Sequence, residues 1–375
     1  MKILFTGGGT GGHFYPVIAV AEEVKRICTE QKIVAPELYF MSDKPYNERA
    51  LSDNGLKFVP VQAGKIRRYF SLMNFFDVFK TIFGSIRAIF TLFSIYPDVV
   101  FGKGGYASFP GLLAARLLRI PVVIHESDSH PGRVTLWAGK FAKRIAVSYP
   151  EAAKYFPPEK TAVVGNPIRR EVLFPAKAGA REFLGLDKNI PIIFVVGGSQ
   201  GAVRINDVVL DILPQLLTDY QVIHQVGKNN YEDLKNRASF LTENNPHKNR
   251  YKLFDYLNDV AMRMTAGAAN LVISRAGSAI FEIANWGIPA IIIPIPEEIS
   301  HDQRTNAFTY ARSGGAVVIE EKNLTPSILL SETKRILDDP ELQKQMKTGA
   351  QSFAKPEAGE KIAEEIIRLA LEHEE

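Results

Sequence analysis

Two glycine-rich loops, each between a predicted strand and a predicted helix, are the clearest chemical features of this 375-residue sequence. Residues 7–12 fit the spacing G-x-G-x-x-G, and residues 197–201 read GGSQG. Bare glycines let the backbone approach a ligand closely, and the helix that follows offers unpaired N–H groups to an anion. Both loops are therefore candidate phosphate sites. A tight turn without a ligand is the alternative for each.

His13 directly follows the first loop. A histidine after such a turn lies at the carboxyl edge of a parallel sheet, where doubly wound folds bind ligands. Its ordinary pKa near 6.5 suits general-base catalysis at neutral pH. A capping or solvent-exposed histidine is the alternative. The loop would also suit a dinucleotide-binding dehydrogenase, in which Asp43 would be the acid that binds the ribose.

Polar residues in and after the second loop are candidate ligands of a diphosphate. Ser199 and Gln200 lie in the loop, and Asn206 lies one turn into the following helix. The chain contains no Asp-x-Asp sequence, with which many sugar transferases hold a metal on the donor diphosphate. We therefore expect no obligatory metal, and we expect Arg169, Arg275 and a helix dipole to neutralise a departing diphosphate.

A third polar cluster follows the apolar run NLVIS. Arg275 begins it, and Glu282 on the next helix could accept hydrogen bonds from two ribose hydroxyls. A structural ion pair between these two residues is the alternative. Asp302 and Gln303, after the run AIIIPIP, suit the binding of sugar hydroxyls. In the first half, residues 102–106 and 125–128 leave apolar strands at the same predicted sheet edge.

Strands and helices alternate along the whole chain, which predicts parallel sheets with crossover helices. Both halves repeat the order strand, glycine loop, helix, so we predict an α/β fold of two doubly wound Rossmann-like domains. The predicted domains are residues 1–165 and 166–349, with a helix at about 350–375 packing back on the first. The predicted strands are residues 2–6, 37–41, 57–61, 98–102, 121–125, 144–147, 161–164, 191–196, 221–226, 250–254, 270–274, 290–293 and 316–319.

The composition is that of a folded protein, with 46% apolar and 23% charged residues. One cysteine, Cys28, excludes a disulfide framework and a cysteine-built zinc site. The opening residues run directly into a strand, so we expect no signal peptide. A net charge of +4 does not indicate nucleic-acid binding. Residues 65–95 are basic and densely apolar, and we expect charge to interrupt them too often for a bilayer span.

The motifs GGTGGH, GxGGY, HE, GNPxR, GGSQGA, SRAG with a following Glu, and a late DQ occur in this order over nearly the whole chain. In this order they closely resemble glycosyltransferase family 28, the inverting N-acetylglucosaminyltransferases of peptidoglycan synthesis. The resemblance implies a GT-B fold, with two domains facing across a cleft. It also implies transfer of N-acetylglucosamine (GlcNAc) from UDP-GlcNAc to the C4 hydroxyl of N-acetylmuramic acid (MurNAc) in undecaprenyl-diphospho-MurNAc-pentapeptide, which converts lipid I to lipid II.

The resemblance assigns roles to the residues already singled out. The base is His13, Glu126 or His125, with His130 in the same loop as a further candidate. Acceptor contacts are implied for Thr10, Gly11, Gly12, Tyr106 and Asp128. Donor contacts are implied for Arg169, Ser199, Gln200, Asn206, Tyr256, Leu257, Arg275, Glu282, Asp302 and Gln303, with the uracil against Tyr256 and Leu257. No cofactor is implied, because UDP-GlcNAc is a substrate.

A lipid-borne acceptor gives residues 65–95 a function, because basic amphipathic segments bind anionic membranes. Core packing of a crossover helix is the alternative. We expect a peripheral protein on the cytoplasmic face of the plasma membrane, with cell-wall synthesis proteins as further partners and no nucleic acid. The rival functions are transfer to a different lipid acceptor, nucleotide-sugar epimerisation, and a non-catalytic scaffold.

Overall fold

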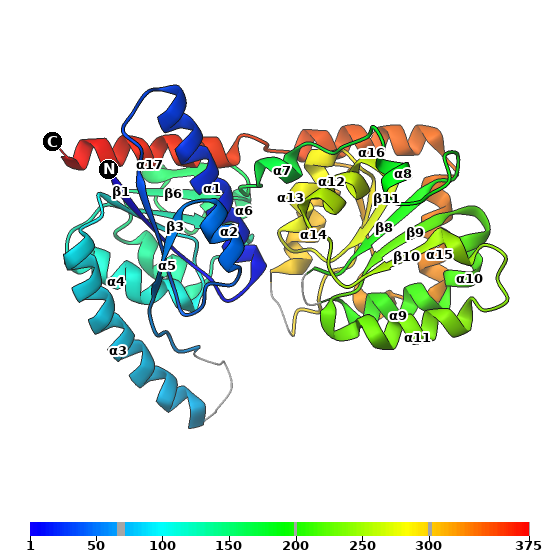
Figure 1. Cartoon of the computed structure of the whole chain (residues 1–375), viewed down its shortest axis with the longest axis horizontal. Helices are drawn as coiled ribbons and strands as arrows, with labels where there is room; N and C mark the ends of the chain where they lie inside the picture. Colours follow the sequence, from blue (N-terminus) through cyan, green and yellow to red (C-terminus); the bar gives the residue numbers. More distant parts are fainter. Residues whose placement is uncertain (66–71, 199–200, 299–301, 375) are drawn as a thin grey trace. The chain divides into compact units, whose positions relative to one another are not determined.

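The computed structural model describes residues 1–65, 72–198, 201–298 and 302–374, which form two compact α/β units (Figure 1). Unit 1 comprises Met1–Arg169 and Lys355–Glu375, and unit 2 comprises Arg170–Ala354. The chain therefore passes from one unit to the other at 169/170 and returns at 354/355, where the sequence predicted boundaries at 165/166 and 349/350.

Unit 1 contains a seven-stranded parallel sheet in the order β3-β2-β1-β4-β5-β6-β7. The strands are β1 Lys2–Thr6, β2 Glu37–Ser42, β3 Leu56–Pro60, β4 Val99–Gly102, β5 Val122–Glu126, β6 Arg144–Val147 and β7 Thr161–Val163. The helices are α1 Gly11–Glu30, α2 Glu48–Asp53, α3 Leu72–Ile95, α4 Phe109–Leu117, α5 Arg133–Gly139, α6 Pro150–Ala153 and α17 Ala358–Glu374, with 3₁₀ turns η1 Tyr106–Ser108 and η2 Pro158–Lys160.

Unit 2 repeats this topology with a six-stranded parallel sheet in the order β10-β9-β8-β11-β12-β13. The strands are β8 Ile192–Val196, β9 Gln221–Gln225, β10 Tyr251–Phe254, β11 Leu271–Ser274, β12 Ala290–Ile292 and β13 Ala316–Val318. The helices are α7 Arg170–Leu173, α8 Ala180–Phe183, α9 Val203–Asp211, α10 Leu213–Asp219, α11 Tyr231–Leu241, α12 Asp259–Ala268, α13 Ala279–Trp286, α14 Gln303–Ala311, α15 Pro326–Leu337 and α16 Pro340–Phe353, with 3₁₀ turns η3 Lys228–Asn230, η4 Lys248–Arg250 and η5 Glu321–Asn323.

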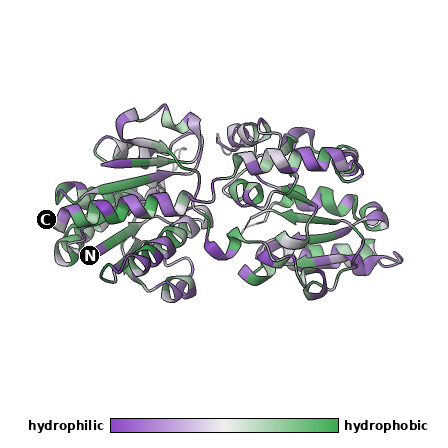
Figure 2. Cartoon of the chain, turned by 90° about the horizontal axis from the view of Figure 1, so that it is seen from above, coloured by the Kyte–Doolittle hydropathy of each residue, from purple (hydrophilic) through white to green (hydrophobic). Residues whose placement is uncertain are grey.

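All thirteen predicted strands are present, and each end lies within one residue of its predicted position. The prediction succeeded because helices cover both faces of each sheet, so the central strands are apolar throughout. Every residue of β4, β5, β8 and β11 is buried, and the strands at the centre of each unit are correspondingly hydrophobic in Figure 2. The predicted doubly wound α/β class is thereby confirmed for both units.

The strand order places a topological switch point in each sheet, where consecutive crossovers leave in opposite directions. In unit 1 it lies between β1 and β4, and in unit 2 between β8 and β11. Doubly wound sheets bind ligands outside the carboxyl ends of their strands at this point. Both glycine loops and the cluster that begins at Arg275 follow strands that flank a switch point.

Helix α17 belongs to unit 1 because its apolar face completes the core on the α1 side of the sheet. Ile362 and Ile366 share one buried cluster with Val17 and Val24 of α1. The last residues of the chain thus return to the unit in which the chain begins (Figure 1).

Helix α3 corrects the expectation that charge interrupts the apolar stretch too early for a bilayer span. It runs without a break over 24 residues, and Phe75–Ile95 is long and apolar enough to cross a membrane by length and composition alone. Its buried side, however, packs on the protein: Ala88 and Leu92 belong to a unit 1 core cluster, and a Cβ on Gly84 would collide with the Gln62 carbonyl. Within the basic stretch 65–95, residues 66–71, which include Arg67 and Arg68, lie outside the described residues.

Candidate active site

The first glycine loop leaves β1 in a conformation that only glycine adopts easily. Gly8 and Gly9 have φ values of 141° and 87°. A Cβ on Gly8 would overlap the Ser42 hydroxyl, and a Cβ on Gly9 would lie 3.2 Å from the Tyr106 ring. Ser42 and Tyr106 therefore pack closely against the backbone of this loop. Thr10 and Gly9 are exposed at its tip, where α1 begins with no acidic residue in its first turn.

His13 lies in the first turn of α1 and is partly exposed. Its Nδ1 is 3.0 Å from the Thr10 hydroxyl, which fixes the direction of the ring. Removal from water, reinforced by the charge of Lys103, lowers the pKa of His13 to about 4. The imidazole is consequently neutral at physiological pH and can accept a proton.

Glu126 ends β5 at the same sheet edge. Its two carboxylate oxygens accept hydrogen bonds from the backbone N–H groups of Asp128, at 3.2 Å, and Gly132, at 3.0 Å. Burial, together with the nearby Asp128 carboxylate, raises the pKa of Glu126 to about 7, although Lys103 and these two hydrogen bonds oppose the shift. A carboxyl group with this pKa also suits general-base catalysis near neutral pH.

The other two predicted base candidates occupy different surroundings. His125 is fully buried, and its Nε2 lies 2.9 Å from the Gly165 carbonyl and 3.3 Å from the Ser148 hydroxyl. His125 therefore packs against the segment around Gly165, and its predicted catalytic role stays a prediction. His130 contacts the Tyr155 hydroxyl at an exposed position.

Tyr106 packs beside the first loop, and its acceptor role stays a prediction. Its hydroxyl donates to Asp43 at 2.8 Å, and burial with this hydrogen bond raises the pKa of Tyr106 to about 12. The Ser42 hydroxyl donates to the same carboxylate. Asp43 is therefore already engaged within the fold, at the place where a dehydrogenase would use an acid to bind ribose.

Arg169 ends unit 1, and its guanidinium stacks 4.1 Å from the centre of the Tyr15 ring. This contact holds a planar cation at the surface of α1, two residues beyond His13. Sequence reasoning included Lys103 only within residues 102–106 and gave it no role. It is a fully buried lysine at the end of β4 whose charge acts on His13, His125 and Glu126.

In unit 2, the second glycine loop closes between β8 and α9. Gly198 and Gly201 have φ values of 81° and 77°, and the Gly201 N–H donates to the Gly198 carbonyl at 3.1 Å. A Cβ on Gly201 would collide with the Val226 carbonyl, so this position requires glycine. The predicted donor ligands Ser199 and Gln200 lie outside the described residues.

Asn206 corrects one predicted donor contact. The residue is fully buried, its Oδ1 lies 3.1 Å from His224 Nε2, and its Nδ2 donates to the Val226 carbonyl at 3.3 Å. The amide thus joins α9 to β9 and supports the glycine loop from within. Leu257 is likewise buried, whereas Tyr256 is 37% exposed.

The third cluster is tied together by α14 and η5. Arg275 forms an ion pair with Glu321 and donates to the carbonyl groups of Ile293 and Pro294. The predicted structural alternative paired Arg275 with Glu282, but the partner that the structure shows is Glu321. Glu282 lies in the first turn of α13.

Gln303 and Asp302 begin α14 beside this cluster. The Gln303 carbonyl oxygen accepts from the N–H groups of Ala276 and Ile295, both at 3.2 Å. Gln303 therefore joins the loops after β11 and β12, and Asp302 occupies the N-cap position of α14. His301 lies outside the described residues.

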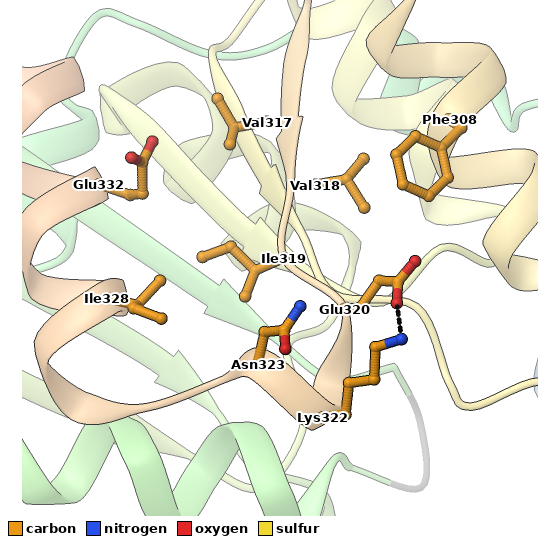
Figure 3. A pocket seen from close by; sticks show the side chains of 9 residues that line it. All are labelled: Phe308, Val317, Val318, Ile319, Glu320, Lys322, Asn323, Ile328 and Glu332. Carbon is orange, nitrogen blue, oxygen red and sulfur yellow. Dashed lines mark ion pairs between the residues drawn. The ribbon is translucent and has the colours of Figure 1, made fainter.

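A pocket of about 420 Å³ lies beside the edge strand β13 (Figure 3). Phe308 comes from α14, and Ile328 and Glu332 come from α15. Glu320 directly precedes the turn η5, and Lys322 lies within that turn. The predicted donor residues are not among those that line this pocket. Within the described ranges no group of three or more His, Cys, Asp or Glu side chains could hold a metal, and the expected absence of a metal stays a prediction.

Comparison with known proteins identifies both halves of the chain. Residues 3–147 match the glycosyltransferase family 28 N-terminal domain, and residues 192–362 match the family 28 C-terminal domain. A relative from Lachnospira eligens is 37% identical over 341 residues, covering 90% of this chain and 91% of the relative. Its name is UDP-N-acetylglucosamine--N-acetylmuramyl-(pentapeptide) pyrophosphoryl-undecaprenol N-acetylglucosamine transferase.

Solved structures show the same fold. MurG from Acinetobacter baumannii superimposes with a TM-score of 0.72 at 26% identity, covering 98% of this chain and 99% of that one. The UDP-GlcNAc 2-epimerase of Neisseria meningitidis, bound to UDP-GlcNAc, gives a TM-score of 0.67 at 14% identity, with coverage of 98% and 100%. The fold alone therefore does not separate a transferase from an epimerase, whereas the family match does.

Proposed function

This chain belongs to glycosyltransferase family 28, and on that premise we propose that it transfers GlcNAc from UDP-GlcNAc to undecaprenyl-diphospho-MurNAc-pentapeptide. The observation that carries the proposal is the 37% identity, over nine tenths of the chain, to a relative with this transferase name. The match covers both units, so the proposal includes a donor site and an acceptor site.

The reaction requires an acceptor hydroxyl to attack the anomeric carbon of GlcNAc. The new C–O bond forms as the bond from that carbon to the UDP oxygen breaks, and the hydroxyl proton passes to a base. His13 is the favoured base because it is neutral, partly exposed and oriented by Thr10. Glu126 is the alternative because its pKa is close to neutral pH.

The departing UDP gains one further negative charge on its terminal phosphate as the sugar leaves. The N-terminus of α9, just after the carboxyl edge of β8, carries a partial positive charge that favours an anion. Arg275 supplies a cation near the same edge, at the end of the neighbouring strand β11. Its existing pair with Glu321 means that a bound diphosphate competes with a carboxylate for the guanidinium.

The lipid-linked acceptor requires unit 1 to reach a membrane, and α3 offers the surface for this contact. Its outward side carries large exposed apolar side chains, and Lys80 and Arg87 are exposed at the margin of that side. The exposed apolar residues are Phe75, Phe76, Phe79, Ile82, Phe83, Ile86, Phe90 and Phe93. Because the opposite side packs on unit 1, we propose that α3 lies in the interface of an anionic membrane rather than across it.

Release of UDP with and without the lipid acceptor tests the proposal against its rivals. We expect UDP release from UDP-GlcNAc to depend on undecaprenyl-diphospho-MurNAc-pentapeptide. Turnover only with a different lipid acceptor would contradict the proposed substrate. Conversion of UDP-GlcNAc to its 2-epimer without an acceptor would support the epimerase function instead.

A further inference from the structure

Lys103 is the residue of unit 1 whose environment the transfer reaction leaves unexplained. It follows β4 directly, and its backbone N–H donates to the Thr6 carbonyl at 2.8 Å, so it continues the pairing with β1. The side chain is 1% exposed, and its Nζ has no hydrogen-bond partner among the residues that the structure describes. An ammonium group buried in this way opposes folding strongly.

Its position follows from the register of three strands. Thr6 pairs with Gly102 and Gly102 pairs with Ile124, so Lys103 lies in one row with Gly7 and His125. A Cβ on Gly7 would lie only 3.1 Å from the Lys103 Cβ, which shows that the lysine stem packs against the bare glycine. The same Cβ would lie 3.6 Å from the His13 carbonyl. Lys103 therefore lies beneath the first turn of α1.

The titratable groups around Lys103 come from β5, from the segment directly after it, and from α1. Glu126 at the end of β5 and Asp128 just after it stabilise its ammonium form. Burial lowers the pKa of His13 in α1 and of His125 in β5, and the charge of Lys103 adds to this effect. Burial lowers the pKa of Lys103 to about 8 against the pull of the two carboxylates. The ammonium form is accordingly the main form at neutral pH.

We propose that Lys103 is a positioning residue for the transfer reaction, a buried cation that opposes protonation of His13 and favours ionisation of Glu126 while the acceptor binds. The geometry supports this role because Lys103 lies in the row between the glycine loop and β5, and within the described residues its side chain makes no hydrogen bond that would explain its burial as structural support. The proposal rests on the proposed function in one respect, because it assumes that the transfer reaction uses His13 and Glu126. Unpaired titratable groups of this kind gather at functional sites.

The protonation of His13 can be measured without any substrate. We expect the histidine NMR signals of the wild-type protein, with His13 assigned by His13→Gln, to show a pKa for His13 well below 6.5. In Lys103→Met, which keeps the length and loses the charge, this pKa should rise by about one unit. Lys140→Met removes an exposed lysine from the same unit and should leave it unchanged.

The same variants extend the test to the reaction. Since protonated His13 cannot accept a proton, the acid limb of the pH profile of kcat/KM should move to higher pH by about one unit in Lys103→Met. The KM for UDP-GlcNAc should stay within twofold. Lys103→Arg keeps the charge and should restore the wild-type profile.

Three results would overturn the proposal. They are an ordinary pKa near 6.5 for His13 in the wild-type protein, an unchanged His13 pKa in Lys103→Met, and an unmoved acid limb despite lower activity. If Lys103→Met does not fold, the titration of His13 in the wild-type protein and in Lys103→Arg tests the proposal instead. Because Lys103→Arg keeps the charge, a His13 pKa that differs from the wild-type value in this variant would also contradict the role. If the protein does not glycosylate the lipid acceptor but the His13 pKa responds to Lys103→Met as expected, the proposed function is refuted and the role of Lys103 is not.

Discussion

His13 and Glu126 lie at the same edge of the unit 1 sheet, but their surroundings shift their pKa values in opposite directions. Burial disfavours the charged form of each, so the pKa of the imidazole falls to about 4 and that of the carboxyl rises to about 7. Sequence reasoning found both residues because they follow apolar strands. It gave Lys103 no role, because one lysine among glycines has no distinctive pattern. It predicted a donor contact for Asn206 and a catalytic role for His125, and both side chains are buried.

Replacing His13 tests the choice of base. In His13→Ala we expect kcat to fall on the order of 10²–10⁴-fold, since this is the usual contribution of a positioned general base. The affinity for UDP should change little, because His13 belongs to unit 1 and the predicted nucleotide loop belongs to unit 2. Steady-state kinetics and calorimetric titration with UDP measure both quantities. Near-normal turnover would remove His13 as the base and favour Glu126.

Glu126 should make stability depend on pH. Its folded pKa lies above its ordinary value, so the folded state binds more protons than the unfolded state between about pH 4.5 and 7, and its ionisation costs stability as pH rises through this window. The difference in unfolding free energy between Glu126→Gln and wild type should therefore shift in favour of the variant by on the order of 2–3 kcal/mol from pH 4.5 to 8.

Chemical denaturation of both proteins at a series of pH values measures this difference. Glutamine presents an N–H group to one of the two backbone donors, which adds an offset that is the same at every pH. A difference that does not change with pH would show that Glu126 ionises in the folded protein as it does in water.

At the scale of elements, the strands were predictable because each is a local apolar run, whereas the tertiary supports were not. Arg275 pairs with Glu321, a residue 46 positions later that reaches it from η5, so no local spacing indicates the pair. The continuous course of α3 was also missed, because its charges were counted along the sequence rather than around the helix. Lys80 and Arg87 lie at the margin of its apolar side and do not interrupt it.

The exposed side of α3 should govern membrane binding. Phe83 and Phe90 are 65% and 71% exposed, and burying such side chains in lipid gains about 1.5–3 kcal/mol each at most. We expect Phe83→Gln with Phe90→Gln to weaken binding to vesicles of anionic lipid by roughly tenfold or more. Co-sedimentation measures this, with Phe240→Gln, at a 79% exposed site of unit 2, as the control. Equal binding of all three proteins would exclude α3 as the membrane surface.

The second glycine loop should be sensitive to a single methyl group. Gly201→Ala combines a φ of 77° with a collision against the Val226 carbonyl, so the loop must move. We expect the affinity for UDP to fall about tenfold, which corresponds to a loss of about 1–2 kcal/mol. Gly179→Ala carries similar strain at φ 70° with open space around its Cβ, and should bind UDP normally. Equal affinities would show that this loop does not hold the nucleotide.

At the scale of the molecule, the repeated strand order explains why two halves of one chain can divide donor and acceptor binding. Each half has its own switch point, and the glycine loops follow the first strand of each half. The sequence predicted this duplication because strand, loop and helix recur in the same order. The fold is shared with an epimerase whose solved structure holds UDP-GlcNAc. The reaction must therefore be identified by measuring its products rather than from the fold.

The central claim is transfer of GlcNAc to a lipid-linked MurNAc-pentapeptide, and the product itself tests it most directly. The full-length protein is incubated with UDP-GlcNAc and undecaprenyl-diphospho-MurNAc-pentapeptide, and the lipid product is analysed by mass spectrometry while UDP is quantified. We predict one molecule of UDP for each lipid that gains one N-acetylhexosamine. Release of UDP without a glycosylated lipid, or epimerised UDP-GlcNAc with an unchanged lipid, would contradict the account.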